Sequence, residues 1–83
     1  MAKGDIVKGV VTFLVSEIVE QPGEVAVTIV EEGPDDITAE VRTAKGDMGR
    51  VIGRRGRVAR SIRTVAQAAA DEEGLVAGVE FVD

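Results

Sequence analysis

Two glycines and a run of arginines are the residues of this sequence best suited to binding chemistry. The segment at residues 51–57 reads VIGRRGR and contains Gly-Arg-Arg-Gly at positions 53–56, directly before a strongly helical stretch. Glycines let a backbone turn sharply and approach another molecule closely, while the amides at a helix start carry partial positive charge. The spacing therefore predicts a loop that binds phosphate groups.

Positive charge is concentrated around this loop. Between residues 42 and 63 the chain has eight arginine and lysine residues but one acidic residue, Asp47, which gives a local charge of +7. Because the whole chain carries −5, the remaining residues sum to −12. The basic character is local, so an anionic ligand is expected at this segment.

Catalytic chemistry is not expected of this composition. The chain has no cysteine and no histidine, so it lacks a thiolate nucleophile and the usual base at neutral pH. The glycine loop lacks the Lys-Ser/Thr pair of a nucleotide-binding P-loop. Acidic side chains gather at the expected ends of elements, where carboxylates are usually solvated: Glu31, Glu32, Asp35, Asp36, Asp71, Glu72 and Glu73. We therefore expect no enzyme activity, no cofactor and no metal site.

Apolar residues at helical spacing predict two long helices and one short helix. The first long helix covers residues 5–20, with Asp5 as its cap, and the second covers residues 57–73. A short helix is expected within residues 44–52, between the strands and the glycine loop. The expected core residues of the last two helices are Met48, Val51, Ile52, Val58, Ile62, Val65, Ala66 and Ala69.

Alternating apolar residues predict three strands. Residues 24–32 and the stretch around 37–42 are separated by Gly-Pro-Asp-Asp, which indicates a hairpin, and a third strand ends the chain. A strand reached through helices usually makes a right-handed parallel crossover. We expect an α+β fold in the order α-β-β-α-α-β, with a three-stranded mixed sheet packed against three helices.

Chain length and composition bound the architecture. Eighty-three residues predict one domain, residues 1–83, close to the lower size at which a single core is sufficient. The only aromatic residues are Phe13 and Phe81, so the core must be built from aliphatic side chains. The first residues lack the pattern of a signal peptide or a membrane span, and we expect a cytoplasmic protein that does not bind membranes.

The stretch DMGRVIGRRGRVARSIRTVAQAAA at residues 47–70 carries a family resemblance. Together with the chain length and the order of elements, it resembles a type II KH domain, and more narrowly the KhpA family of small bacterial KH-domain proteins. A Gly-x-x-Gly alone would be weak evidence. The Val-Ile lead-in, the following arginine and the helix make the resemblance specific.

The resemblance implies binding of single-stranded RNA, about four nucleotides per domain, with the loop clamping the sugar-phosphate backbone. The loop and nearby arginines are expected to contact phosphates, and three aliphatic residues are expected to line a groove for bases. These residues are Gly53, Arg54, Arg55, Gly56, Arg57, Arg60, Val51, Ile52 and Val41. The acidic turn at residues 33–36 and the net charge of −5 predict weak binding with low sequence specificity.

The resemblance also implies protein partners. KhpA-like proteins are associated with self-pairing and with a larger KH-domain partner, KhpB, so a homodimer or a heterodimer with a KhpB-like protein is expected. The residues expected at such an interface are Ile62, Val65 and Ala69. The implied role is that of an RNA chaperone or post-transcriptional regulator, linked to cell-envelope growth and cell shape.

Three other interpretations remain open for the glycine loop and its helix. The loop can be a tight helix connection whose arginines are solvated. The domain can be a protein-interaction module in which RNA binding is incidental. The basic helix can enter a DNA groove, although arginines clustered at a helix start suit phosphate contact better than base readout.

Overall fold

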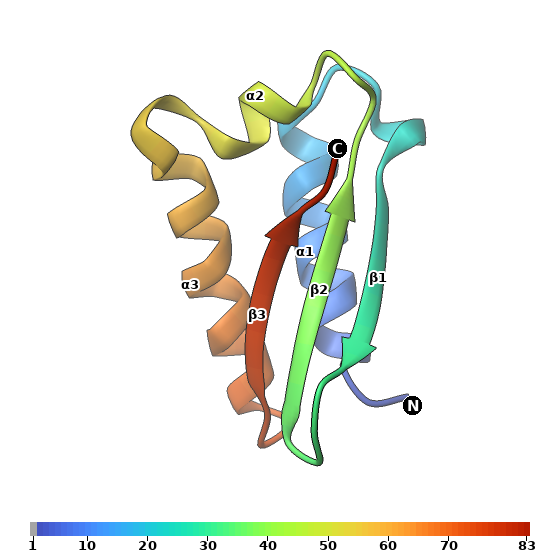
Figure 1. The fold of residues 1–83 in the computed structure, drawn as a ribbon, viewed down its shortest axis with the longest axis vertical. Coiled ribbons are helices and arrows are strands. Elements are labelled where there is room, and N and C mark those ends of the chain that lie inside the picture. The colour runs from blue at the N-terminus through green and yellow to red at the C-terminus, as the bar shows by residue number, and fades with distance from the viewer. Residues whose placement is uncertain (1) are drawn as a thin grey trace.

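A three-stranded sheet with two long helices on one of its faces forms the structure, a computed structural model that describes residues 2–83 (Figure 1). The elements are α1 (Asp5–Ile18), a 3-10 turn (Pro22–Glu24), β1 (Ala26–Glu31), β2 (Asp36–Arg42), α2 (Met48–Ile52), a second 3-10 turn (Arg54–Gly56), α3 (Arg57–Asp71) and β3 (Val76–Phe81). The predicted α+β class and the α-β-β-α-α-β order are confirmed. None of the helices within residues 2–83 is long and apolar enough to cross a membrane.

Strand β2 lies at the centre of the sheet. It pairs antiparallel with β1, where Val27 is opposite Val41, and parallel with β3, where Ala39 is opposite Val79. The hairpin and the parallel crossover expected from the sequence are both present. The crossover passes through α2 and α3, which places the glycine loop beyond the end of the sheet where β2 and β3 finish (Figure 1).

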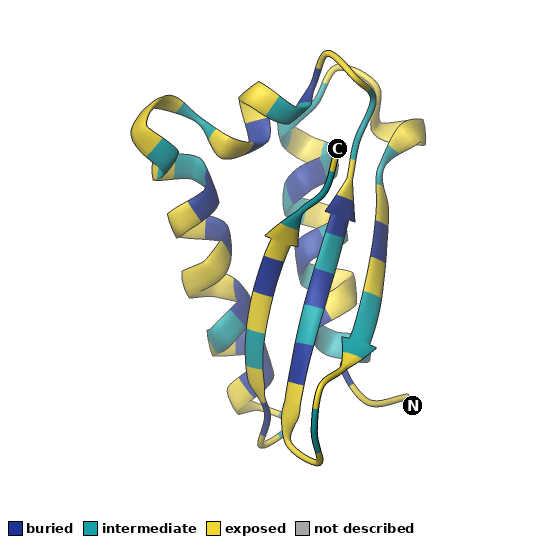
Figure 2. Cartoon of the chain, in the orientation of Figure 1, coloured by how far each residue is buried: buried dark blue, intermediate teal, exposed yellow. Residues whose placement is uncertain are grey.

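The core lies between the sheet and the helices α1 and α3. Along β2, buried residues alternate with more exposed ones, because successive side chains of a strand point to opposite faces (Figure 2). No helix of residues 2–83 lies over the other face of the sheet (Figure 1). The fully or almost fully buried aliphatic residues include Val7, Val11, Val15, Ile37, Ala39, Val41, Val51, Ile62, Ala66 and Ala70.

Two residues expected in the core are exposed. Ile52 keeps 39% of its surface exposed and Val65 keeps 40%. Helix α2 has only five residues, and Val51 is the one whose side chain is buried in the core. In α3 the buried stripe runs through Ile62, Ala66 and Ala69, and Val65 lies about 100° around the helix from Ala66.

The beginning of α1 differs from the expected capping. Gly4, with φ 85°, precedes the helix, and the Asp5 carboxylate accepts a hydrogen bond from the Ala2 N–H (2.8 Å) instead of capping α1. The carboxylate of Glu73, expected to be solvated, accepts the N–H groups of Gly4 (3.0 Å) and Ile6 (3.3 Å). Glu73 therefore joins the end of α3 to the start of α1.

Candidate nucleic-acid interface

The glycine loop at residues 53–56 is a tight turn with three positive φ angles. Gly53 has φ 75° and ψ 171°, Arg55 has φ 57°, and Gly56 has φ 72°. The Gly56 N–H donates to the Gly53 carbonyl oxygen (3.1 Å), and the Gly53 N–H donates to Gly49 in α2 (2.9 Å). A positive φ is uncommon for a residue with a side chain, so Arg55 is held in a strained conformation by this turn.

The two loop glycines have different surroundings. A Cβ atom on Gly53 would lie 2.5 Å from Cγ2 of Val58 in α3, whereas a Cβ on Gly56 would meet nothing within 4 Å. Gly53 is thus required by packing against α3. Gly56 faces open space, where another molecule can approach the backbone.

Four arginines surround this turn with uncompensated charge. Arg54, Arg55, Arg57 and Arg60 are all exposed. The ion pairs found within residues 2–83 involve Lys3, Arg42 and Arg50, and none of these four arginines. Their guanidinium groups therefore remain available to an anion.

The other arginines of the basic segment are engaged within the fold. Arg50 pairs with Glu20 and with Asp47, and Arg42 pairs with Glu40 at 3.6 Å. Arg63 donates from Nε to the Val79 carbonyl oxygen (3.3 Å), and its guanidinium carbon lies 5.3 Å from the centre of the Phe81 ring. Of the eight basic residues in the segment, three arginines are thus engaged within the fold, four arginines lie at the loop, and Lys45 belongs to neither group.

Asp47 positions α2, although in the sequence it counts only as the one acidic residue of the basic segment. Its side chain is almost completely buried, and its two carboxylate oxygens accept the N–H groups of Glu20 and Gln21, each at 3.1 Å. Its carbonyl oxygen accepts the N–H of Arg50 in the first turn of α2. The only sequence signal for this role was an Asp directly before a short helix. Its hydrogen-bond partners could not be predicted, because they lie 26 and 27 residues away in the chain.

The aliphatic groove expected for bases is partly wrong. Val41 and Val51 are both 0% exposed, because they face the core from β2 and α2, so neither side chain forms part of the surface. Ile52 is the one of the three that reaches the surface. Similarly, Ile62 and Ala69 of the expected protein interface are buried at 2% and 9% exposure, so only Val65 of that set is accessible.

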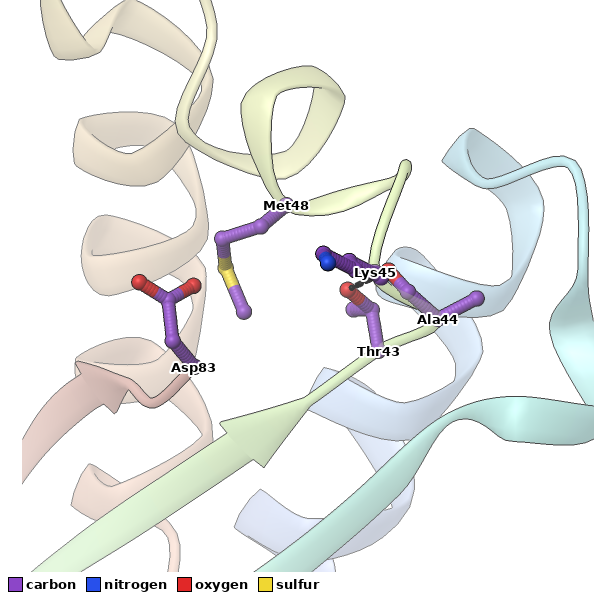
Figure 3. A pocket seen from close by; sticks show the side chains of 5 residues that line it. All are labelled: Thr43, Ala44, Lys45, Met48 and Asp83. Carbon is purple, nitrogen blue, oxygen red and sulfur yellow. Dashed lines mark hydrogen bonds between the residues drawn. The ribbon is translucent and has the colours of Figure 1, made fainter.

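A hollow of about 550 Å³, which no local sequence pattern predicts, lies beside α2. It is lined by Thr43, Ala44, Lys45, Met48 and Asp83. Figure 3 shows the Met48 thioether between the Asp83 carboxylate on one side and Lys45 on the other. These residues follow β2, begin α2 and follow β3, and only the parallel pairing of the two strands brings them together.

Comparisons with known proteins identify relatives of this chain. The chain is 40% identical over 75 residues to the "RNA-binding protein KhpA" of Clostridium acetobutylicum, covering 90% of this chain and 99% of the relative. It is 36% identical over 73 residues to the protein of the same name in Borreliella burgdorferi, covering 88% of each chain. No solved structure matches. A family model described as "KhpA/KhpB, KH domain" matches residues 8–81, and the chain therefore belongs to the KhpA/KhpB KH-domain family.

Proposed function

We propose that this protein binds single-stranded RNA, with the loop at residues 53–56 holding the sugar-phosphate backbone. The observation that carries the proposal is the set of four exposed arginines, Arg54, Arg55, Arg57 and Arg60, that form no ion pair within residues 2–83. Relatives that cover most of the chain are named RNA-binding proteins, which supports the same ligand.

Each part of the loop has a separate task in this proposal. Gly56 leaves open space for close approach of a phosphate, and the start of the 15-residue helix α3 adds partial positive charge there. Arg54 and Arg55 at the tip, with Arg57 and Arg60 on the first turns of α3, contribute charge-assisted contacts. The exposed side chain of Ile52, directly before the loop, supplies an apolar surface for a base.

The protein acts by binding and not by catalysis in this proposal. Its biological role is that of an RNA chaperone or post-transcriptional regulator in the cytoplasm, with a link to cell shape and envelope growth as the resemblance implies. A homodimer, or a heterodimer with a larger KhpB-like protein, would hold more nucleotides than one domain and offset weak contacts by each.

The test is fluorescence anisotropy of a short labelled single-stranded RNA at several salt concentrations. We expect binding that weakens as salt rises, because Lys and Arg contacts release counterions. The Arg54→Asp, Arg55→Asp variant should lose binding while circular dichroism shows an unchanged fold. Arg54→Asp alone should weaken binding much more than Lys8→Asp, a matched charge reversal on the exposed face of α1.

Several results would contradict the proposal. Equal binding by the wild type and the double variant would exclude the loop as the RNA site. Tighter binding to a duplex DNA of the same length would favour the groove-binding interpretation. If no RNA binds but a protein partner is still captured by both forms, the protein-interaction interpretation replaces RNA binding.

A further inference from the structure

The hollow beside α2 lies within reach of a nucleotide chain held by the loop. Met48 is the first residue of α2 and Gly53 directly follows its last residue. At a rise of 1.5 Å per residue, the two positions are separated by about 8 Å along the helix. A strand whose backbone is held at residues 53–56 can therefore place a neighbouring base beside Met48.

The lining of the hollow combines an apolar surface with one group that only donates and one that only accepts hydrogen bonds. Met48 and Ala44 supply the apolar surface. Thr43 already uses its hydroxyl proton, which it donates to the Ala44 carbonyl oxygen at 2.9 Å. Lys45 and Asp83 are exposed, and across residues 2–83 neither is found in an ion pair. A ligand can thus engage both charged groups.

We propose that this hollow receives one base of the bound RNA and that Asp83 and Lys45 select guanine. The proposal rests on the RNA-binding function proposed above. An ionised carboxylate only accepts hydrogen bonds, and guanine offers it two adjacent donors, N1–H and the N2 amino group. The Lys45 ammonium can donate to guanine O6 and N7, a pairing that proteins commonly use.

The other bases match this pair of groups less well. Uracil has its single ring N–H between two carbonyl oxygens, which would face the Asp83 carboxylate with like partial charge. Adenine and cytosine each offer an amino group without an adjacent ring N–H donor, so they can make one of the two hydrogen bonds. Uracil is therefore expected to be the least favoured base.

Size and surface chemistry of the hollow agree with a base as its occupant. Its volume of about 550 Å³ falls in the range of typical small-molecule sites, roughly 300–1,000 Å³. The thioether of Met48 can pack against a flat aromatic ring, a contact that methionine sulfur makes favourably. The base would then lie between the two charged groups that Figure 3 shows on either side of Met48.

The test uses four labelled uridine-rich RNAs of equal length that differ only in the central base, titrated with the full chain. We expect the guanine-containing RNA to bind about tenfold more tightly than the all-uridine RNA, as one good bidentate pair provides. Asp83→Asn should remove most of this preference, because an amide can accept one bond and donate another, which suits uracil. Glu80→Gln, the same charge change on an exposed side chain of β3, should leave the preference intact.

The outcomes separate this inference from the function on which it rests. If all four RNAs bind with equal affinity in a manner that requires Arg54 and Arg55, the loop proposal stands and the guanine site is wrong. If Asp83→Asn retains the full preference for guanine, Asp83 does not read the base and the inference is also overturned. If none of the RNAs binds, both proposals fail together.

Discussion

At the scale of single residues, Gly53 and Gly56 share a positive φ but differ in how much an added side chain should lower the free energy of unfolding. Gly53→Ala places a methyl group against Val58 in a backbone region that is essentially restricted to glycine. We expect it to lower the free energy of unfolding by about 3 kcal/mol. In Gly56→Ala the added methyl group enters open space, and only the left-handed backbone conformation is unfavourable. We expect this variant to lower the free energy of unfolding by about 1 kcal/mol. Urea unfolding of both variants measures this difference, and equal losses would contradict it.

Asp47 joins the start of α2 to residues 20 and 21, a contact that local sequence patterns do not show. Asp47→Asn leaves one acceptor oxygen for two backbone N–H groups, those of Glu20 and Gln21. We expect a loss of about 1–3 kcal/mol in the free energy of unfolding, because a buried donor is left unsatisfied. Asp35→Asn, in the exposed turn between β1 and β2, is the control and should change stability by less than about 0.5 kcal/mol. Equal stability of the two variants would show that Asp47 does not hold α2.

At the scale of elements, α3 supports the loop at one end and the edge of the sheet along its length. Gln67 accepts the Ala77 N–H (3.0 Å) and donates to the Leu75 carbonyl oxygen (3.2 Å), while Arg63 donates to Val79. These bonds occupy backbone groups of β3, and of Leu75 directly before it, on the side away from β2. The outer edge of β3 is therefore covered by side chains of α3, and this contact holds the helix that begins at the loop.

The end of α3 should also stabilise the start of α1. Glu73→Ala removes the acceptor for the N–H groups of Gly4 and Ile6, so we expect a loss of about 1 kcal/mol in the free energy of unfolding. Hydrogen exchange should become faster at the Ile6 amide. Glu72→Ala, at the exposed neighbouring position, is the matched control and should leave both quantities nearly unchanged. Unchanged exchange in Glu73→Ala would refute the capping role.

The elements themselves were predictable, because their signals are local. The helical spacing of apolar residues such as Val7 and Val11 indicated α1, and the alternation of Ile37, Ala39 and Val41 indicated the inward face of β2. For the shorter or less regular elements, the sequence pattern did not show which side faces the core. Val65 and Ile52 fit a helical apolar pattern as well as their buried neighbours do, and only the contacts of α2 and α3 decide which of them face the core.

At the scale of the whole molecule, one accessible residue remains of the expected protein interface. Val65 is 40% exposed on α3, so Val65→Asp should change the free energy of unfolding by less than about 0.5 kcal/mol. We expect sedimentation velocity to show self-association in the wild type and its loss in Val65→Asp. Phe13→Asp provides the control, since Phe13 is an apolar residue on α1 that is 63% exposed. Disruption by Phe13→Asp alone would move the interface to α1.

The sequence by itself determined the type of loop, the order of the elements and the concentration of positive charge, because each depends on residues close together in the chain. The tertiary structure decided which arginines are available to an anion and which are engaged within the fold. Arg50 pairs with Glu20, and Arg63 packs over Phe81, only after folding. The tertiary structure also decided that Val41 is buried in the core and that Asp83 lies beside Met48. Those outcomes depend on packing between segments distant in sequence, which local patterns of residues do not encode.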